Sequence, residues 1–307
     1  MAWAYDGISH DIVPIGLPSG RIGTPIELAD PVVNLAVSGD GILGYALLAS
    51  GSAPDAKWTL AIVNLSTGRL RDSLPLPQIG GGATIAVGPD ELTVYVGGDH
   101  DLYPVYLTQR RVGRPIPVPC GPCGWIAISS DGNTAYVVSG SQDKITPVNL
   151  STKTAEASIS LPQIRLGSIV ISPDGKTAFI SSPGQGVYAT PLGSPENSAL
   201  VPVSGATFVV LDPWDRTPYA VDSFPGALTP IDPTTLSLGS PIDVGIQIER
   251  VAISASGTAI AVGGASNPSR NAAYVIVDLA TGRMQRFTPP RGTFLGVILG
   301  VAVGPSH

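Results

Sequence analysis

Histidine is the side chain that most often transfers protons or binds transition metals near neutral pH, and this sequence contains three of them. His10 and His100 are each followed by an aspartate, Asp11 and Asp101. A histidine beside a carboxylate has the composition of half of a proton-transfer pair. The alternative for both pairs is an exposed loop in which a histidine precedes a turn aspartate. Whether the histidines converge on one site depends on the fold.

A second candidate for chemistry is the segment Cys120-Gly-Pro-Cys123. The same four residues form the redox centre of thioredoxin-like proteins, where the first cysteine begins a helix that lowers its pKa. Here the following residues lead into a strand, so that mechanism is missing, and one such pair supplies only two ligands of a zinc site. Three interpretations stay open: a local disulfide, which we favour, two free thiols in a turn, and a redox or ligand-attaching role.

A repeated segment determines where these residues lie. An apolar run that ends in a turn occurs seven times, with steps of 50, 41, 43, 40, 42 and 50 residues, which is typical of the four-stranded blades of a β-propeller. The small residue in the middle of each run is Ala36, Ala86, Ala127, Val170, Val210, Ala252 or Ala302. A second strand then carries a large residue in register: Tyr45, Tyr95, Tyr136, Phe179, Tyr219, Ile260 and, from the other end of the chain, Trp3.

The repeat predicts an all-β fold: a seven-bladed β-propeller of four-stranded antiparallel blades that forms a single domain over residues 1–307. The first strand of each blade lies at the crowded axis and favours small side chains, whereas the second lies where more volume must be filled. Four third strands carry proline at one place, Pro14, Pro104, Pro147 and Pro230. Since proline cannot donate a ladder hydrogen bond, we expect a local bulge there.

The two ends of the sequence are expected to complete one blade together. The segment from Met1 begins like a second strand, and Gly300 to His307 has the pattern of a first strand. Pairing them closes the ring and removes two open sheet edges. We therefore expect the termini to lie side by side, and neither a linker nor a second domain.

Two segments carry a family resemblance. Residues 126–154, IAISSDGNTAYVVSGSQDKITPVNLSTKT, and 169–182, IVISPDGKTAFISS, resemble the repeats of YVTN-type (YncE-like) seven-bladed β-propeller proteins, and the T-P-I and G-x-P-I sequences look like the actinobacterial branch. The usual asparagine at the end of the second strand is replaced here. The resemblance implies the fold and, since such proteins are often exported, an extracytoplasmic or secreted location. It implies no single activity, because similar propellers serve as lactonase-type enzymes, dehydrogenase subunits and interaction modules.

In such a propeller, the connections between second and third strands and between blades share one face. His10 and His100 fall on this face in the first and third blades, with a blade between them, and His307 falls on the opposite face. The three histidines are therefore not expected to converge on a metal ion, and we predict neither a metal site nor a catalytic residue.

The mouth of the central channel is the predicted ligand site. The residues that begin the first strands have mixed chemistry, which suits a small polar or aromatic ligand: Trp125, Phe208, Arg250, Thr84, Asn34 and Ser168. The alternative is that they only cap the channel and bind water. Further candidates on this face are His10, Asp11, His100, Asp101, Arg165, Glu249 and Arg291.

Composition narrows the function. The net charge of −6 opposes nucleic-acid binding, and no apolar run reaches the roughly 18 residues of a membrane span. Met1 leads directly into a strand-like segment, so we expect no signal peptide here. We predict a monomeric, non-catalytic scaffold, without cofactor, that binds an unknown protein or small molecule through the loops around the channel. The alternative is a lactonase- or lyase-like enzyme at the channel mouth, which would use Glu249, Arg250 or Arg291 near a histidine or a metal.

Overall fold

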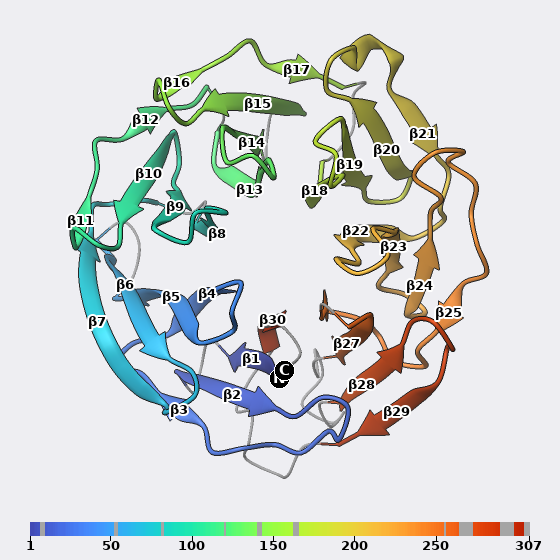
Figure 1. The fold of residues 1–307 in the computed structure, drawn as a ribbon, viewed down its shortest axis with the longest axis horizontal. Helices are drawn as coiled ribbons and strands as arrows, with labels where there is room; N and C mark the ends of the chain where they lie inside the picture. The colour runs from blue at the N-terminus through green and yellow to red at the C-terminus, as the bar shows by residue number, and fades with distance from the viewer. Residues whose placement is uncertain are drawn as a thin grey trace.

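Short apolar segments separated by turns form seven antiparallel sheets, which stand as blades around a central axis (Figure 1). We name the strand positions of each blade a to d from the axis outward and number the blades 1 to 7 from the N-terminus. The computed structural model describes residues 1–6, 10–51, 55–80, 83–119, 121–139, 143–161, 166–254, 256–263, 273–288 and 298–303. The predicted seven-bladed β-propeller is confirmed.

The strands of the first four blades, in the order a to d, have the following bounds. Blade 1 contains β30 (Ile298–Val303), β1 (Ala2–Asp6), β2 (Asp11–Ile15) and β3 (Ile26–Glu27). Blade 2 contains β4 (Val32–Val37), β5 (Leu43–Ser50), β6 (Lys57–Asn64) and β7 (Arg69–Leu76). Blade 3 contains β8 (Thr84–Val87), β9 (Thr93–Gly97), β10 (Asp101–Tyr106) and a divided d strand, β11 (Arg111–Val112) and β12 (Ile116–Pro117). Blade 4 contains β13 (Cys123–Ile128), β14 (Thr134–Ser139), β15 (Lys144–Asn149) and another divided d strand, β16 (Thr154–Ala155) and β17 (Ile159–Ser160).

The remaining three blades follow the same order. Blade 5 contains β18 (Ile169–Ile171), β19 (Thr177–Ser182), β20 (Gly186–Pro191) and β21 (Ala199–Val201), with the short 3-10 helix η1 (Pro195–Asn197) before β21. Blade 6 contains β22 (Ala206–Leu211), β23 (Pro218–Asp222), β24 (Ala227–Pro230) and β25 (Ile242–Asp243). Blade 7 contains β26 (Arg250–Ile253), β27 (Thr258–Gly263), β28 (Ala273–Asp278) and β29 (Met284–Phe287). In the described ranges no helix is long and apolar enough to cross a membrane.

The register between strands a and b is the one that the repeat predicts. In every blade the small residue of strand a lies opposite the large residue of strand b: Ala36–Tyr45, Ala86–Tyr95, Ala127–Tyr136, Val170–Phe179, Val210–Tyr219, Ala252–Ile260 and Ala302–Trp3. Directly opposed residues of an antiparallel pair point to the same face of the sheet. In blades 2 to 7, one small and one large side chain therefore lie side by side against the neighbouring blade.

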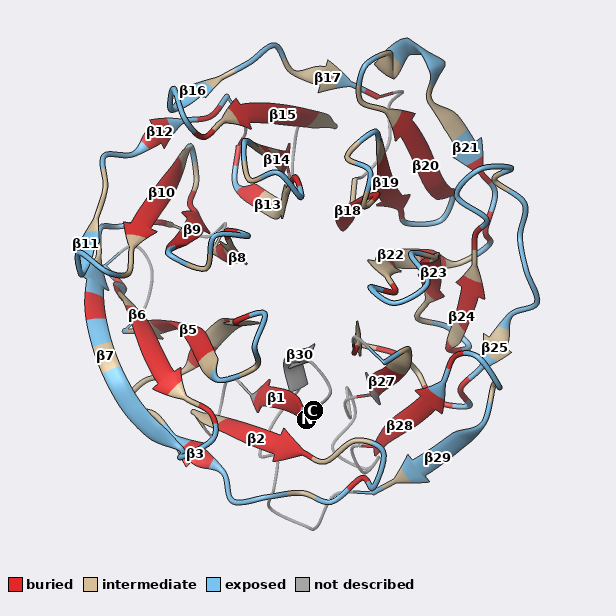
Figure 2. Cartoon of the chain, viewed as in Figure 1, coloured by how far each residue is buried: buried red, intermediate tan, exposed pale blue. Residues whose placement is uncertain are grey.

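The hydrophobic core lies in strands b and c, between neighbouring blades. Figure 2 shows these strands buried and the outer d strands largely exposed. The a strands are mostly half-buried, as in β8 and β26, because their free edge borders the central channel. The core thus forms a ring of packed interfaces around an open axis.

The two ends of the chain close the ring, as predicted. β1 pairs with β30, so that Ala2 lies opposite Val303 and Trp3 opposite Ala302, and the N and C marks lie together in Figure 1. Blade 1 therefore takes its innermost strand from one end of the chain and its other three strands from the opposite end.

We predict that deleting residues 293–307, which include β30, lowers the free energy of unfolding by about 5 kcal/mol or more. The deletion exposes the inner edge of β1 and opens the ring between blades 7 and 1. Urea unfolding followed by circular dichroism measures the loss. A shortened chain with the unfolding midpoint of the full chain would show that closure does not hold the ring together.

The prediction of a bulge at the strand c prolines is wrong in its location. Pro14, Pro104, Pro147 and Pro230 pair with strand b in unbroken register. The irregularity lies instead in strand d, which is interrupted where it passes each proline. β11 and β12 flank Pro104, and β16 and β17 flank Pro147. The missing donor of proline therefore faces strand d, and the outer strand bends away from it.

Blades without this proline provide the comparison. Ile62 of β6 and Ile276 of β28 occupy the equivalent position, and their partners β7 and β29 are continuous. In three blades with the proline, a glycine of strand d donates to its carbonyl: Gly23 to Pro14, Gly113 to Pro104 and Gly239 to Pro230. A Cβ atom on Gly239 would lie 2.7 Å from Cγ of Pro230. Glycine is favoured in these three blades because the outer segment packs closely on the proline ring, whereas in blade 4 the amide of Glu156 donates to the Pro147 carbonyl.

This contact predicts a coupling that a double-mutant cycle measures. Gly239→Ala should lower the free energy of unfolding by about 1–3 kcal/mol, because the added methyl group overlaps the proline ring. The same change in a Pro230→Ala background should have a much smaller effect, since the other Pro230 atoms near that Cβ lie at 3.7 Å. Additive effects would contradict the contact.

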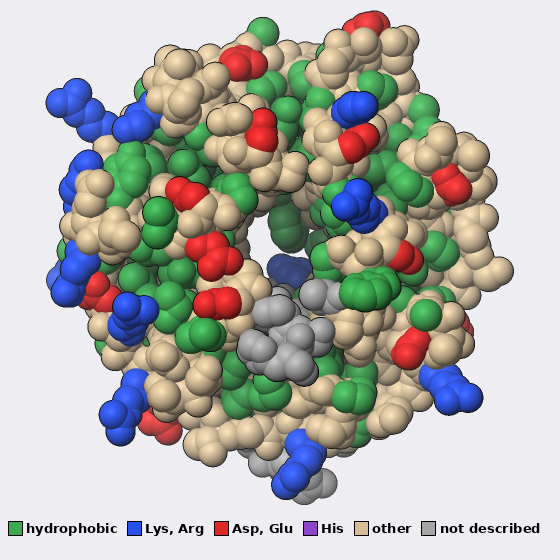
Figure 3. Space-filling view, in the orientation of Figure 1, with side chains coloured by type: hydrophobic (Ala, Val, Ile, Leu, Met, Phe, Trp, Pro, Cys, Tyr) green, Lys and Arg blue, Asp and Glu red, His purple; other side chains and the backbone are tan. Residues whose placement is uncertain are grey.

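The a–b turns share a hydrogen-bonded serine and aspartate. Ser129 Oγ donates to Asp131 Oδ1 at 2.6 Å, and Ser172 Oγ donates to Asp174 Oδ1 at 2.6 Å. The bond from Ser129 is the largest of the contributions that lower the pKa of Asp131 to about 2. Acidic side chains near the central opening are visible in Figure 3. The carboxylates of Asp131 and Asp174 are held in place within their own turns by these serines.

Blade 6 departs from this turn, because Asp212 replaces the serine. Its side chain is 2% exposed, Oδ1 accepts from the amide of Trp214 at 2.8 Å, and burial raises the pKa of the carboxyl group. A raised pKa in the folded state stabilises the protein only while the group is protonated, so stability falls as the pH rises through that pKa.

We therefore expect Asp212→Asn to raise the free energy of unfolding at pH 7 and to have little effect below about pH 4, where the carboxyl is protonated in both states. The amide oxygen still accepts from Trp214. Urea unfolding at both pH values tests this, with Asp243→Asn, at an exposed aspartate of the same blade, as the control. A gain of the same size at both pH values would mean that ionisation is not its cause.

Candidate functional site

Three side chains from three blades meet in the central channel, and we call them the channel cluster. The rings of Trp125, at β13, and Phe208, at β22, pack edge to face with centroids 6.2 Å apart. The guanidinium of Arg250, at the start of β26, lies 5.3 Å from the centroid of Phe208. Trp125 and Phe208 belong to blades 4 and 6, so their contact passes in front of blade 5. Figure 3 shows a Lys or Arg side chain within the central opening.

Two other residues at this register, Ser168 and Asn34, form hydrogen bonds to the next blade or the connection that leads to it. Ser168 of blade 5 accepts from the Val209 amide at 2.7 Å and lies 3.1 Å from the Val209 carbonyl oxygen, which ties it to strand a of blade 6. Asn34 of blade 2 donates to the Ala83 carbonyl at 3.5 Å. Blade 1 has Gly300 here, opposite Tyr5. Small residues thus join the ring, and the large ones enter the channel.

Arg250 supplies the positive charge of the channel cluster. Its Nη1 donates to the Glu249 carbonyl at 2.8 Å, which fixes the start of the side chain in β26. Burial raises the pKa of Tyr5 to about 12, and the nearby charge of Arg250 opposes this rise. A guanidinium beside a pair of packed aromatic rings matches an anion that has a flat apolar body.

The structure places the predicted His10, Asp11, His100 and Asp101 away from this cluster. His10 and Asp11 lie at the start of β2 in blade 1, and His100 and Asp101 lie at the start of β10 in blade 3, with blade 2 between them. Arg165, Arg291 and His307 lie outside the described residues. Within the ranges that the structure describes, no three His, Cys, Asp or Glu side chains are placed to hold a metal ion together.

The proposed Cys120–Cys123 disulfide is not tested, because Cys120 lies outside the described residues. Cys123 is buried at the start of β13. Its Sγ lies 3.9 Å from the Asp101 carbonyl oxygen of the neighbouring blade. The second cysteine is therefore a packed part of the interface between blades 3 and 4.

A pocket between blades 2 and 3 contains the predicted His100 and Asp101 together with residues that the sequence argument missed. This blade 2–3 pocket has a volume of about 500 Å³ and includes Trp58, Tyr103 and Gln78 in its lining. The signal for Trp58 was present in the repeat. It lies four positions before Ile62, just as His10 and His100 lie four positions before Pro14 and Pro104.

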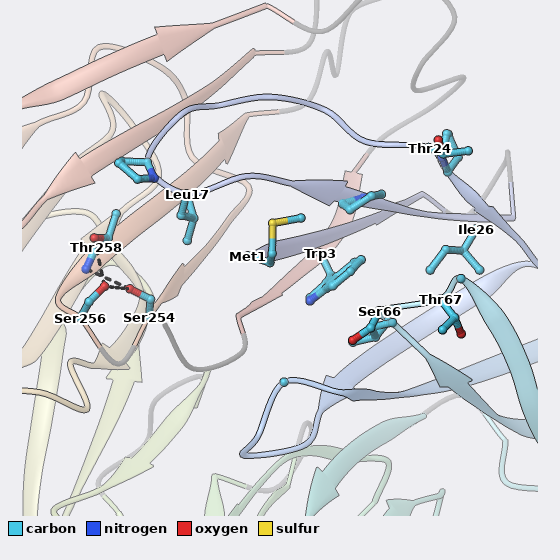
Figure 4. A pocket seen from close by; sticks show the side chains of 16 residues that line it. Met1, Trp3, Leu17, Thr24, Ile26, Ser66, Thr67, Ser254, Ser256 and Thr258 are labelled. Carbon is cyan, nitrogen blue, oxygen red and sulfur yellow. Dashed lines mark hydrogen bonds between the residues drawn. The ribbon is translucent and has the colours of Figure 1, made fainter. Parts of the chain in front are cut away.

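A larger cavity lies on the opposite face, at about 850 Å³, and was not predicted. Figure 4 shows Ser254, Ser256 and Thr258 at one end, Thr24, Ile26, Ser66 and Thr67 at the other, and Trp3 between them. Trp3 is 5% exposed and its Nε1 has no hydrogen-bond partner among the described residues. No charged side chain is in the lining, so the cavity identifies no ligand class.

Comparison with known proteins supports the fold. No family model matches the sequence, and no curated protein matches it significantly. The structure is similar to a solved chain described as hydrazine synthase of Kuenenia stuttgartiensis, with a TM-score of 0.59 and 20% sequence identity over 69% of this chain and 67% of that chain. At this identity the likeness shows a shared β-propeller architecture.

Proposed function

We propose that this β-propeller is a monomeric, non-catalytic scaffold that binds a small organic anion in its central channel. The observation that carries this is the channel cluster, in which Trp125, Phe208 and Arg250 come from three different blades. We also propose, from the sequence resemblance, that the repeats are of the YVTN type and that the protein is exported.

The chemistry of the cluster supports a flat carboxylate as ligand. A guanidinium forms two parallel hydrogen bonds with a carboxylate, and the two aromatic rings offer apolar surface for an aromatic body. Arg250 is half-buried, so part of its charge is removed from water and its attraction for an anion is screened less. The rigid ring holds these side chains in place before binding, which reduces the entropy lost on association.

Two matched probes test the proposal: benzoate and its uncharged analogue benzyl alcohol. We expect benzoate to bind more tightly than benzyl alcohol in isothermal titration calorimetry. Arg250→Gln should weaken benzoate binding about tenfold or more, which corresponds to about 1.4 kcal/mol. The variant should leave the weak binding of benzyl alcohol unchanged, because that probe carries no charge.

Arg114→Gln is the matched control, since Arg114 is an exposed arginine beside the outer strand β12. Equal benzoate affinity in the wild type and in Arg250→Gln, or no binding at all, would contradict the proposal. Turnover of a lactone substrate that is lost in Arg250→Gln and retained in Arg114→Gln would replace the scaffold with the enzyme alternative.

A further inference from the structure

The blade 2–3 pocket has the size and walls of a small-molecule site. At about 500 Å³ it lies within the range of pockets that hold small ligands. Strand b and c residues of blade 2, Ala49 and Trp58, form one wall, and Asp101 and Tyr103 of β10 form the other. Ile79, in the connection between the blades, closes the floor and is itself buried.

The indole of Trp58 offers a hydrogen bond that the described protein does not use. The side chain is 9% exposed, and its Nε1 is buried without a hydrogen-bond partner in the part of the chain that the structure describes. Buried donors in folded proteins are nearly always paired, and an unpaired one is destabilising. A ligand with an acceptor atom in this pocket would supply the missing partner.

The charge of the pocket is negative. The lining includes the carboxyl groups of Asp99 and Asp101, and Tyr103 Oη donates to Asp101 Oδ2 at 3.4 Å. Burial, and after it the Asp101 carboxylate, raises the pKa of Tyr103. His100 is exposed at the rim, and Lys57, next to Trp58, is exposed on the other face of β6. Aromatic rings beside carboxylates attract organic cations.

We propose that the blade 2–3 pocket binds a small organic cation that carries an apolar body and one hydrogen-bond acceptor. The cation lies against the Asp101 carboxylate, the apolar body packs between Trp58 and Tyr103, and the acceptor takes the Trp58 Nε1 hydrogen. The pocket is separate from the channel cluster, so this site does not depend on the proposed function.

Three probes of nearly equal shape test the charge: tyramine, a cation, 4-ethylphenol, which is neutral, and 3-(4-hydroxyphenyl)propionate, an anion. Isothermal titration calorimetry of the full chain should give the tightest binding for tyramine, by about tenfold or more over 4-ethylphenol. The anion should bind most weakly. Asp101→Asn should remove the preference for tyramine and leave 4-ethylphenol binding nearly unchanged.

Trp58→Phe keeps an aromatic wall and removes the N–H group. We expect it to weaken tyramine and 4-ethylphenol together by about fivefold to tenfold, because both phenol groups lose the same donor. Circular dichroism of the ligand-free variant checks that it stays folded, since the smaller ring leaves space in the core around Trp58. Trp214→Phe is the control, because Trp214 is 75% exposed in an a–b turn on the opposite face.

Three results would overturn this site: no binding of tyramine, equal binding of tyramine and 4-ethylphenol, or tyramine binding unaffected by Asp101→Asn and Trp58→Phe. Arg250→Gln should not alter tyramine binding. Failure at this pocket and failure at the channel cluster are therefore distinguished by which variant responds.

Discussion

The whole ring depends on how side-chain volume changes with distance from the axis. Seven sheets stand around one central axis. The space between neighbouring blades is therefore small beside strand a and larger beside strand b. The opposed pairs Ala36–Tyr45 and Ala302–Trp3 satisfy this gradient in adjacent blades. Because every blade repeats the same pairing, neighbouring sheets pack as wedges, and the interfaces between them hold most of the core. The central channel borders the free edges of the strands a, and Trp125, Phe208 and Arg250 extend into it.

The outer edge of the ring is protected from pairing with other strands by different local devices. Where strand c carries proline, strand d is short or divided. Blade 2 lacks this proline, and its continuous strand β7 instead contains Pro75, which has no donor, and Ser73, whose amide donates to Asp72 Oδ1 at 2.8 Å. Exposed sheet edges invite aggregation. The outer edge is therefore made a poor partner for other strands in different ways. Strand d is short or divided where strand c carries proline, and in β7 two residues of strand d itself withhold donors.

The register, the closure and the number of blades were predictable because they rest on short-range periodicity. Ala127 lies opposite Tyr136 as a consequence of the spacing within one hairpin. The break in strand d was not predictable, because it depends on which edge of Pro104 faces the outer strand. The contact between Trp125 and Phe208 was only partly predictable. Their shared register placed both at the channel mouth, but the contact also requires a small residue, Ser168, in the blade between them.

The candidate site could likewise be predicted only in part. His100 and Asp101 were singled out as a polar pair, whereas the described pocket adds Trp58 and Tyr103 from two blades. No spacing along the chain brings Trp58 near Asp101, because they meet only when blades 2 and 3 pack. The repeat pattern predicts the strands of each blade, but it does not predict which residues of two neighbouring blades come together at their interface.

The pairing of β1 with β30 also sets the order of assembly. Blades 2 to 7 are built from strands adjacent in sequence, so they need only short loops to close, whereas blade 1 joins residues from opposite ends of the chain. The entropy of closing a loop rises with its length, and contacts distant in sequence form slowly. The seam is therefore the last part of the ring to form. Until then the inner edge of β1 accepts any β30, and at high concentration the strand of a second molecule competes for it, so that two chains exchange their last strands and fold as one.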